Sequence, residues 1–358
     1  MIDRSKRRSD PFVLATLLAL VASHALIANA SGAACTQFGN PPATLLSSPI
    51  PLCHGGDLLG PWNDSDGTPR YSCVYEPPSA SASKPLPMIV FLHPSLNDAD
   101  SVVFTDFLTF LDTADLSGDT SKPGYILLAP EGRNTSHFYT DGDATGLGWD
   151  NWYRQFSAAV TTPPENVDAA AIDHFIAAEV ATGKVDSNRI YVSGWSNGAA
   201  MAYIYGLNRS NIAAIGVYSA PDPWAFSIDP CEQIPAGGQP KMGGRKISIR
   251  KIPIANSRVP TYQVHNGCDI VGLCPNSKRM EKRLRKIGVS IADQIIGLAS
   301  DPTNPAHQDA ARRCFAQCGT NPNGDDTNGL GANNHSRWPT DWTQSIFDFF
   351  RTHPLSAQ

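Results

Sequence analysis

Short apolar runs and amphipathic stretches alternate along most of this chain. Apolar runs bounded by turn-forming residues predict buried strands at 87–94, 124–130, 189–194, 212–220 and 259–267. Helical spacing of apolar residues predicts helices at 99–116, 166–183 and 197–207, and a last helix near the C-terminus. Strands that alternate with helices are typical of a mostly parallel sheet with helices on both faces. The pattern therefore predicts an α/β fold.

Three segments do not follow this alternation. Residues 221–258 and 288–333 are irregular and rich in Gly and Pro, and we expect them to be insertions over the sheet, where binding surfaces are often built. Residues 31–70 are rich in Pro, Gly and Ser and contain two cysteines. They are interpreted as a disulfide-stapled N-terminal segment that precedes the main domain, residues 71–358.

The first 30 residues have the features of a secretory signal peptide. A basic head precedes an apolar stretch that ends in Ala28-Asn29-Ala30, an A-x-A cleavage site. The apolar stretch is short for a membrane span and is interrupted by His24. We therefore expect a secreted protein, extracellular or periplasmic, with no stable membrane anchor after cleavage.

The cysteines agree with export. All eight lie beyond the expected cleavage site, and an even number in an exported chain predicts disulfides. Cys268 and Cys274 are close enough for a disulfide between them to stiffen the loop that they flank. The spacings contain no paired C-x-x-C units with a nearby histidine, so no metal site and no cofactor are expected.

Composition adds one exclusion. With 41% hydrophobic and 17% charged residues the chain is typical of a globular protein. Its formal net charge of −5 argues against a nucleic-acid partner, although the chain contains local basic runs. Those runs are interpreted as solvated surface.

A possible nucleophile lies where a strand meets a helix. Gly194-Trp195-Ser196-Asn197-Gly198 fits the pattern G-x-S-x-G, in which a strained turn lifts the serine hydroxyl above a sheet. The apolar run before the motif and the helical pattern after it supply the context that this pattern requires. The sequence therefore predicts Ser196 as a nucleophile, with an ordinary glycine-rich turn as the alternative.

A serine nucleophile needs a base and an acid, which in this architecture follow it in the order acid, then histidine. Asp269 comes just after the predicted strand 259–267, and His335 lies in a Gly/Asn-rich loop before the last helix. They are the predicted acid and base. Asp222 is the alternative acid and His307 the alternative base.

Two further groups of residues are predicted from the same chemistry. The oxyanion formed on acyl attack needs two donors, for which we expect the backbone N–H groups of Asn197 and Ser95, with Leu96 as a second choice to Ser95. Pro94 has no N–H to donate. Aromatic side chains that could line the cleft are Trp195, Trp338, Trp149 and Trp152, each with core packing as its alternative.

Several stretches together resemble a known family. "FLHPS", "GWDNWYR", "VDSNRIYVSGWSNGAAMAY", "HNGCD" and "NNHSRWP" are similar to secreted esterases of the α/β-hydrolase fold, in the group of poly(3-hydroxybutyrate) depolymerases and feruloyl or acetylxylan esterases. The similarity extends from about residue 70 to 352. It implies that Ser196, Asp269 and His335 act as nucleophile, acid and base on an ester substrate, possibly polymeric. The family usually has His-Gly where this chain has His93-Pro94.

Two other functions are compatible with these residues. An acyltransferase would use the same acyl-enzyme and pass the acyl group to an alcohol instead of water. A binding protein could keep the fold without catalysis. The complete order of serine, aspartate and histidine favours a serine carboxylesterase over both.

Overall fold

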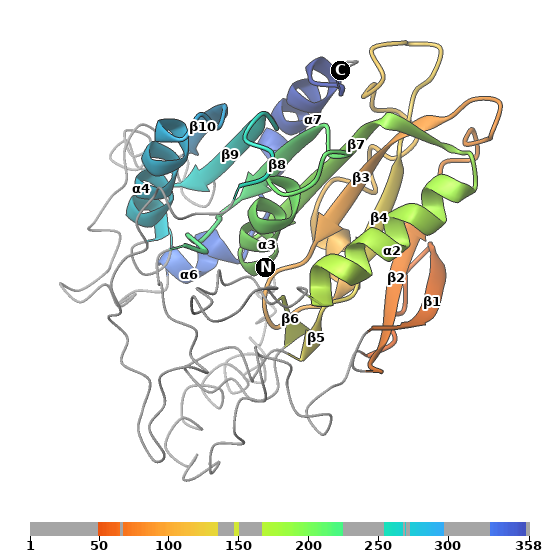
Figure 1. Ribbon diagram of the computed structural model, residues 1–358, viewed down its shortest axis with the longest axis horizontal. Helices are drawn as coiled ribbons and strands as arrows, with labels where there is room; N and C mark the ends of the chain where they lie inside the picture. The colour runs from red at the N-terminus through yellow and green to blue at the C-terminus, as the bar shows by residue number, and fades with distance from the viewer. Residues whose placement is uncertain are drawn as a thin grey trace, which may run out of the picture.

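A twisted sheet of eight strands runs through the described part of the chain (Figure 1). The computed structural model describes residues 49–64, 67–134, 147–149, 167–224, 254–267, 269, 273–296 and 330–355. The strand order is β1-β2-β4-β3-β7-β8-β9-β10. The strands are β1 (Asp57–Asn63), β2 (Pro69–Tyr75), β3 (Leu86–Leu92), β4 (Ile126–Pro130), β7 (Val185–Trp195), β8 (Ala214–Tyr218), β9 (Thr261–Asn266) and β10 (Ile291–Ile296).

The strands from β4 to β10 in that order are parallel, and β2 joins β4 antiparallel. Their carboxyl ends therefore lie along one edge of the sheet, where loops can bring distant residues together. Strand order and direction are those of the α/β-hydrolase fold, so the predicted fold class is confirmed. A separate two-stranded ribbon joins β5 (Arg133–Asn134) and β6 (Leu147–Gly148).

The apolar runs are uninterrupted because both faces of the sheet are covered. On β3, Met88, Val90 and Leu92 belong to one core cluster, while Ile89 and Phe91 belong to the other. Successive side chains of a strand point to opposite faces, so each strand supplies both cores.

Helices cover the two faces unequally. Apolar residues of α2 (Val167–Ala181), α3 (Asn197–Gly206) and α4 (Leu273–Lys286) belong to the first cluster, and these helices lie on one side of the sheet (Figure 1). Side chains of the 3-10 helix η4 (Ala99–Phe104) and of α7 (Thr343–Thr352) belong to the second. The short helices α6 (Leu330–His335) and η7 (Thr340–Trp342) precede α7.

The five predicted strands and the helices at 166–183 and 197–207 are confirmed within a few residues. The helix predicted at 99–116 is wrong. The structure has only η4 there, because Thr105 takes an extended conformation. Its hydroxyl donates to the Val102 carbonyl at 2.7 Å and accepts from the Phe107 N–H at 3.2 Å, which replaces helical bonding with a turn.

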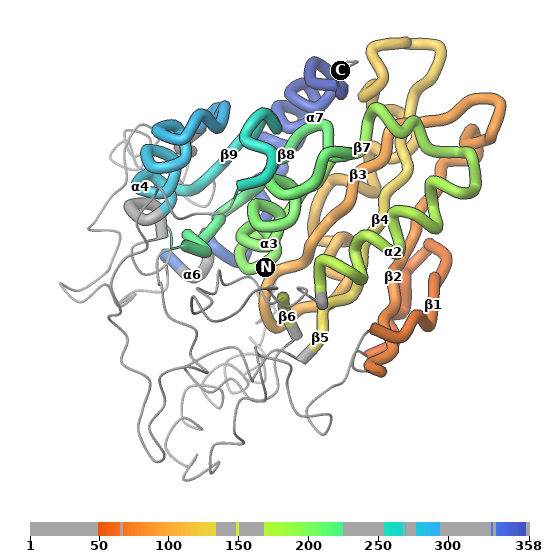
Figure 2. The backbone as a smooth tube through the Cα atoms, in the orientation of Figure 1, coloured from red at the N-terminus to blue at the C-terminus, as the bar shows by residue number. Residues whose placement is uncertain are grey.

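Four elements were missed by the sequence analysis. Strands β1 and β2 form one edge of the sheet, and part of the predicted stapled segment therefore belongs to it; Figure 2 shows them at the side opposite α4. Strand β10 lies in the segment interpreted as an irregular insertion. Helix α4 contains one of the local basic runs, SKRMEKRLRK, which were interpreted as solvated surface. It is amphipathic, since Ser277, Met280 and Leu284 are buried along one face.

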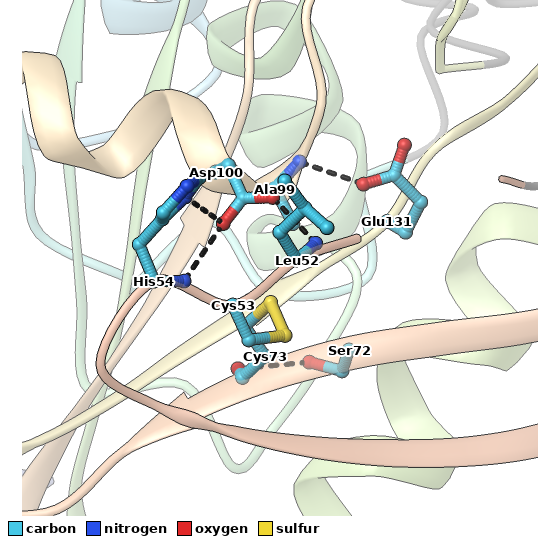
Figure 3. Close-up of a disulfide and its surroundings, with 8 residues drawn as sticks. All are labelled: Leu52, Cys53, His54, Ser72, Cys73, Ala99, Asp100 and Glu131. Carbon is cyan, nitrogen blue, oxygen red and sulfur yellow. Dashed lines mark hydrogen bonds and ion pairs between the residues drawn. A yellow bond between two sulfur atoms is a disulfide. The ribbon is translucent and has the colours of Figure 1, made fainter. Parts of the chain in front are cut away.

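A disulfide and an aspartate attach the N-terminal end of the described chain to the main body (Figure 3). Cys53 is bonded to Cys73 of β2. Asp100 of η4 accepts from the backbone N–H groups of Leu52 and His54 at 2.7 and 3.1 Å and contacts the His54 ring. Residues 52–54 are thus held to β2 and to η4 at once.

A buried cluster of opposite charges lies next to β1 and β2. Arg70 reaches Asp168 of α2 at 2.7 Å and Asp64 at 3.4 Å, and Arg133 reaches Asp64 at 2.7 Å. All four side chains are at most 1% exposed, so each charge depends on its partners. The cluster links the ends of β1, β2 and β4 to the start of α2.

Candidate active site

Ser196 lies at a strained turn between β7 and α3. Its backbone has φ 56° and ψ −116°, a conformation that costs a serine roughly 1–3 kcal/mol. The turn is possible because its neighbours are glycines. A Cβ on Gly198 would clash with the carbonyl oxygens of Leu92 and His93, and one on Gly194 would clash with the Gly198 backbone.

The structure brings the three predicted catalytic side chains into one hydrogen-bonded chain. His335 Nε2 lies 2.7 Å from Ser196 Oγ, and His335 Nδ1 lies 2.8 Å from Asp269 Oδ1. Because a carboxylate only accepts, Nδ1 carries the proton and Nε2 is left to accept from the serine hydroxyl. The Asp269 side chain is buried, whereas that of His335 is 15% exposed.

His335 ends α6, whereas the sequence predicted a loop. Two buried aromatic side chains hold the backbone of this helix end. The Trp195 indole N–H donates to the His335 carbonyl at 2.8 Å, and the Tyr218 hydroxyl donates to the Asn334 carbonyl at 2.7 Å. The imidazole is therefore positioned from β7 and β8.

Asp269 follows β9, as expected from the sequence. Besides His335, it accepts a short hydrogen bond on Oδ2 from the hydroxyl of Ser219, the residue after β8. The alternative acid, Asp222, forms hydrogen bonds with residues other than His335. Its carboxylate accepts from Arg283 at 2.6 Å and from the backbone N–H of Trp224 at 2.9 Å.

The two expected oxyanion donors belong to Asn197, directly after Ser196, and to Ser95, in the loop after β3. Asn197 is the first residue of α3, so its backbone N–H lies at the N-terminal end of the helix, where N–H groups stabilise negative charge. Ser95 lies three residues beyond the end of β3, which pairs with β7 through Leu92 and Gly194. Leu96, the residue after Ser95, has φ 63°, an uncommon conformation for leucine, so the chain turns sharply at this point of the loop.

The loop that carries Ser95 is fixed at both ends by residues that follow β4. The His93 ring accepts from the Gly132 N–H on Nε2 at 2.8 Å and donates from Nδ1 to the Pro94 carbonyl at 2.8 Å. The Ala99 N–H donates to Glu131 at 2.6 Å. Burial lowers the pKa of His93 to about 4, which keeps the ring neutral and able to accept.

The expected cleft-lining role of three tryptophans is corrected by their burial. Trp149, Trp195 and Trp338 are each at most 5% exposed. The Trp338 ring packs edge-on against Phe91 and Phe107, and its N–H donates to Thr343. The Trp149 indole N–H donates to the His93 carbonyl at 2.9 Å, and its backbone N–H donates to the Asn197 side chain at 2.7 Å. The structure thus assigns these rings to packing and positioning.

Several predicted residues fall outside what the structure describes. They are the signal peptide 1–30, Trp152, His307, Cys268 and the side chain of Cys274. No described helix is long and apolar enough to cross a membrane. His265, which the sequence placed in a strand, lies buried in β9 with Nδ1 3.3 Å from Asp293.

The roles of Ser219, Tyr218 and His93 were not predicted from the sequence. Single serines and tyrosines carry no motif, and their positions follow only from which strands are neighbours in the sheet. His93 was visible in the sequence as part of "FLHP", but its bond to Gly132 depends on the pairing of β3 with β4.

Part of the chain is similar to a known protein family. Residues 71–222 match the family model described as Esterase PHB depolymerase. No curated protein matches the sequence.

Three solved structures illustrate the similarity of fold. A thermostable esterase is 14% identical with a TM-score of 0.45, over 85% of this chain and 64% of that one, so this chain spans just under two thirds of its length. A CE1 ferulic acid esterase from Anaeromyces mucronatus is 15% identical with a TM-score of 0.45, over 78% and 92%. An acetyl xylan esterase from Aspergillus awamori is 16% identical with a TM-score of 0.39, over 63% and 81%.

The matched segment runs from β2 to the loop after β8 and contains Ser196 at its turn. Through this segment the chain is similar to the esterase PHB depolymerase family.

Proposed function

We propose that the protein is a secreted serine carboxylesterase in which Ser196, His335 and Asp269 act as nucleophile, base and acid. The observation that carries the proposal is the unbroken chain of hydrogen bonds from Ser196 Oγ through the imidazole to Asp269. A serine hydroxyl at neutral pH is a weak nucleophile, and a base that is itself held by an acid activates it.

The reaction has two halves. His335 Nε2 takes the proton as Ser196 Oγ attacks the ester carbonyl, and the same proton passes to the departing alcohol. Water then attacks the acyl-enzyme by the reverse path and releases the acid. The N–H groups of Asn197 and Ser95 would bind the oxyanion, and each such donor lowers the activation free energy by about 3 kcal/mol in comparable sites.

Export is supported by two observations. The first 30 residues have a basic head, an apolar stretch and an A-x-A site, and Cys53 and Cys73 form a disulfide. The ester itself is proposed to belong to a polyester or to a feruloylated or acetylated polysaccharide. Parallel hydrolysis of polyhydroxybutyrate, methyl ferulate and acetylated xylan would separate these substrates.

The direct test uses p-nitrophenyl butyrate with the wild type, Ser196→Ala and Ser193→Ala. Ser193 is a matched control because it lies three residues earlier in β7 and its buried hydroxyl has no hydrogen-bond partner in the described part of the chain. We expect Ser196→Ala to lose at least about 10³-fold in kcat with an unchanged melting temperature, while Ser193→Ala stays near the wild type.

A second readout identifies the nucleophile directly. A fluorophosphonate should label the wild type, and peptide mass mapping should place the label on Ser196. Wild-type turnover by Ser196→Ala, or a label on another residue, would refute the mechanism. If an added alcohol captured most of the acyl group in competition with water, the protein would be an acyltransferase.

A further inference from the structure

Ser219 occupies an unusual backbone position at the carboxyl end of β8. It has φ 54°, in the left-handed region where a serine is uncommon and a glycine is not. Its backbone N–H donates to the Val264 carbonyl of β9 at 3.0 Å, and the residue is completely buried. The turn is therefore fixed between two neighbouring strands.

A chain that needed only this turn would be better served by glycine, because glycine takes a positive φ without strain. Serine instead adds one hydroxyl, and that hydroxyl donates to Asp269. The benefit of serine here thus lies in the bond that its side chain makes.

Among the residues that the structure describes, His335 and Ser219 bind different oxygens of this carboxylate. Asp269 Oδ1 accepts from His335 and Oδ2 accepts from Ser219. A carboxylate held at one oxygen can still turn about its Cβ–Cγ bond, whereas one held at both oxygens keeps its plane. Oδ1 then faces the imidazole continuously.

We propose that Ser219 is a positioning residue that holds the Asp269 carboxylate in the plane required by His335. The inference rests on the proposed function, since it acts through the same three residues. Ser219 touches no reacting atom, so its removal should lower kcat and leave KM almost unchanged.

The test separates the hydroxyl from the backbone. Ser219→Gly removes the hydroxyl but accepts the positive φ, and Ser219→Ala removes it with the strain kept. We expect both variants to lose about 10- to 100-fold in kcat on p-nitrophenyl butyrate, with KM within about twofold. The melting temperature of Ser219→Gly should stay near that of the wild type, so it remains informative if Ser219→Ala folds poorly.

Ser277→Ala is the matched control. The Ser277 hydroxyl donates to the Ala220 carbonyl at 2.6 Å, so it ties the same loop one residue further on without touching Asp269. We expect Ser277→Ala to lower stability and to keep kcat within about threefold.

A double-mutant cycle decides whether Ser219 acts through Asp269. In the Asp269→Ala background, Ser219→Gly should cause no further loss of kcat. An equal loss in both backgrounds, or wild-type kcat for Ser219→Gly, would overturn the inference. If Asp269→Ala itself kept wild-type kcat, the proposed function would fail as well, so the two failures are distinguishable.

Discussion

Trp195 donates its indole N–H to the carbonyl of His335, 140 positions later in the chain. The side chain next to the proposed nucleophile thus holds the backbone of the proposed base. Because Trp195 ends β7 and precedes Ser196 directly, any movement of the turn is transmitted to both groups.

Removal of the Trp195 indole N–H should make the position of His335 less fixed, while an aromatic ring still fills the core. Trp195→Phe keeps an aromatic ring but leaves the His335 carbonyl without its donor, and we expect a loss of about 10-fold in kcat with little change in KM. Trp338→Phe is the control, since Trp338 packs in the same aromatic cluster but bonds to Thr343. Equal losses in the two variants would show that packing, and not the bond to His335, is responsible.

The close approach at Gly198 predicts a severe effect of one methyl group. In Gly198→Ala the Cβ would overlap the carbonyl oxygens of Leu92 and His93, which are backbone atoms and cannot turn away. We expect a loss of several kcal/mol in the free energy of unfolding, measured by urea denaturation, and loss of activity. Ala200→Gly, two residues further along α3, should cost only about 1 kcal/mol. A stable, active Gly198→Ala variant would contradict the described turn.

His93 should make stability depend on pH. Burial lowers its folded-state pKa to about 4, below the ordinary value of 6.5, so the fold favours the neutral ring. This contribution is fully present above about pH 6.5 and is lost as the pH falls through about 4, and it amounts to about 3 kcal/mol.

The measurement is the free energy of unfolding at several values between pH 4 and 7 for the wild type and His93→Gln. Because glutamine does not titrate, the difference between the two proteins should shrink on acidification. His353→Gln, at the end of α7, is the control. A difference that is independent of pH would contradict the neutral, buried ring.

The Cys53–Cys73 disulfide should contribute to stability through the loop that it closes. The two cysteines are 20 positions apart, and a loop of this size contributes about 3 kcal/mol. We expect Cys53→Ala/Cys73→Ala to lose about this amount in urea denaturation under non-reducing conditions. Mass mapping of the non-reduced wild type should recover the pair, and free thiols at both positions would contradict it.

The sequence reveals the centre of this fold better than its edges. Runs such as 87–94 are apolar almost throughout because both faces of the sheet are covered. Such a run can be recognised from the sequence alone. Strand β1 is mostly exposed, and in β10 (IADQII) Asp293 and Gln294 interrupt the apolar residues, so neither strand is an unbroken apolar run. The segment 99–116 has apolar residues at helical spacing, but Thr105 redirects the hydrogen bonds.

The residues of the candidate site also differ in how clearly the sequence indicates them. Ser196, Asp269 and His335 are indicated by a motif and by chain order, and the structure brings them within hydrogen-bonding distance. Ser219 and Tyr218 depend on which strands are neighbours, which no local pattern encodes. Trp149, Trp195 and Trp338 are buried, and the sequence could not show this because an aromatic residue near a motif suits a cleft and a core equally well.

The left-handed backbone at residue 196 also limits which atoms could replace the serine oxygen. Threonine offers the same hydroxyl, but its branched Cβ is poorly compatible with φ 56°, so a secondary alcohol is excluded from this turn. Cysteine is unbranched and fits the same backbone. Replacement of the nucleophilic oxygen by sulfur, as in Ser196→Cys, is therefore compatible with this turn. Addition of a methyl group to Cβ, as in Ser196→Thr, is poorly compatible with it.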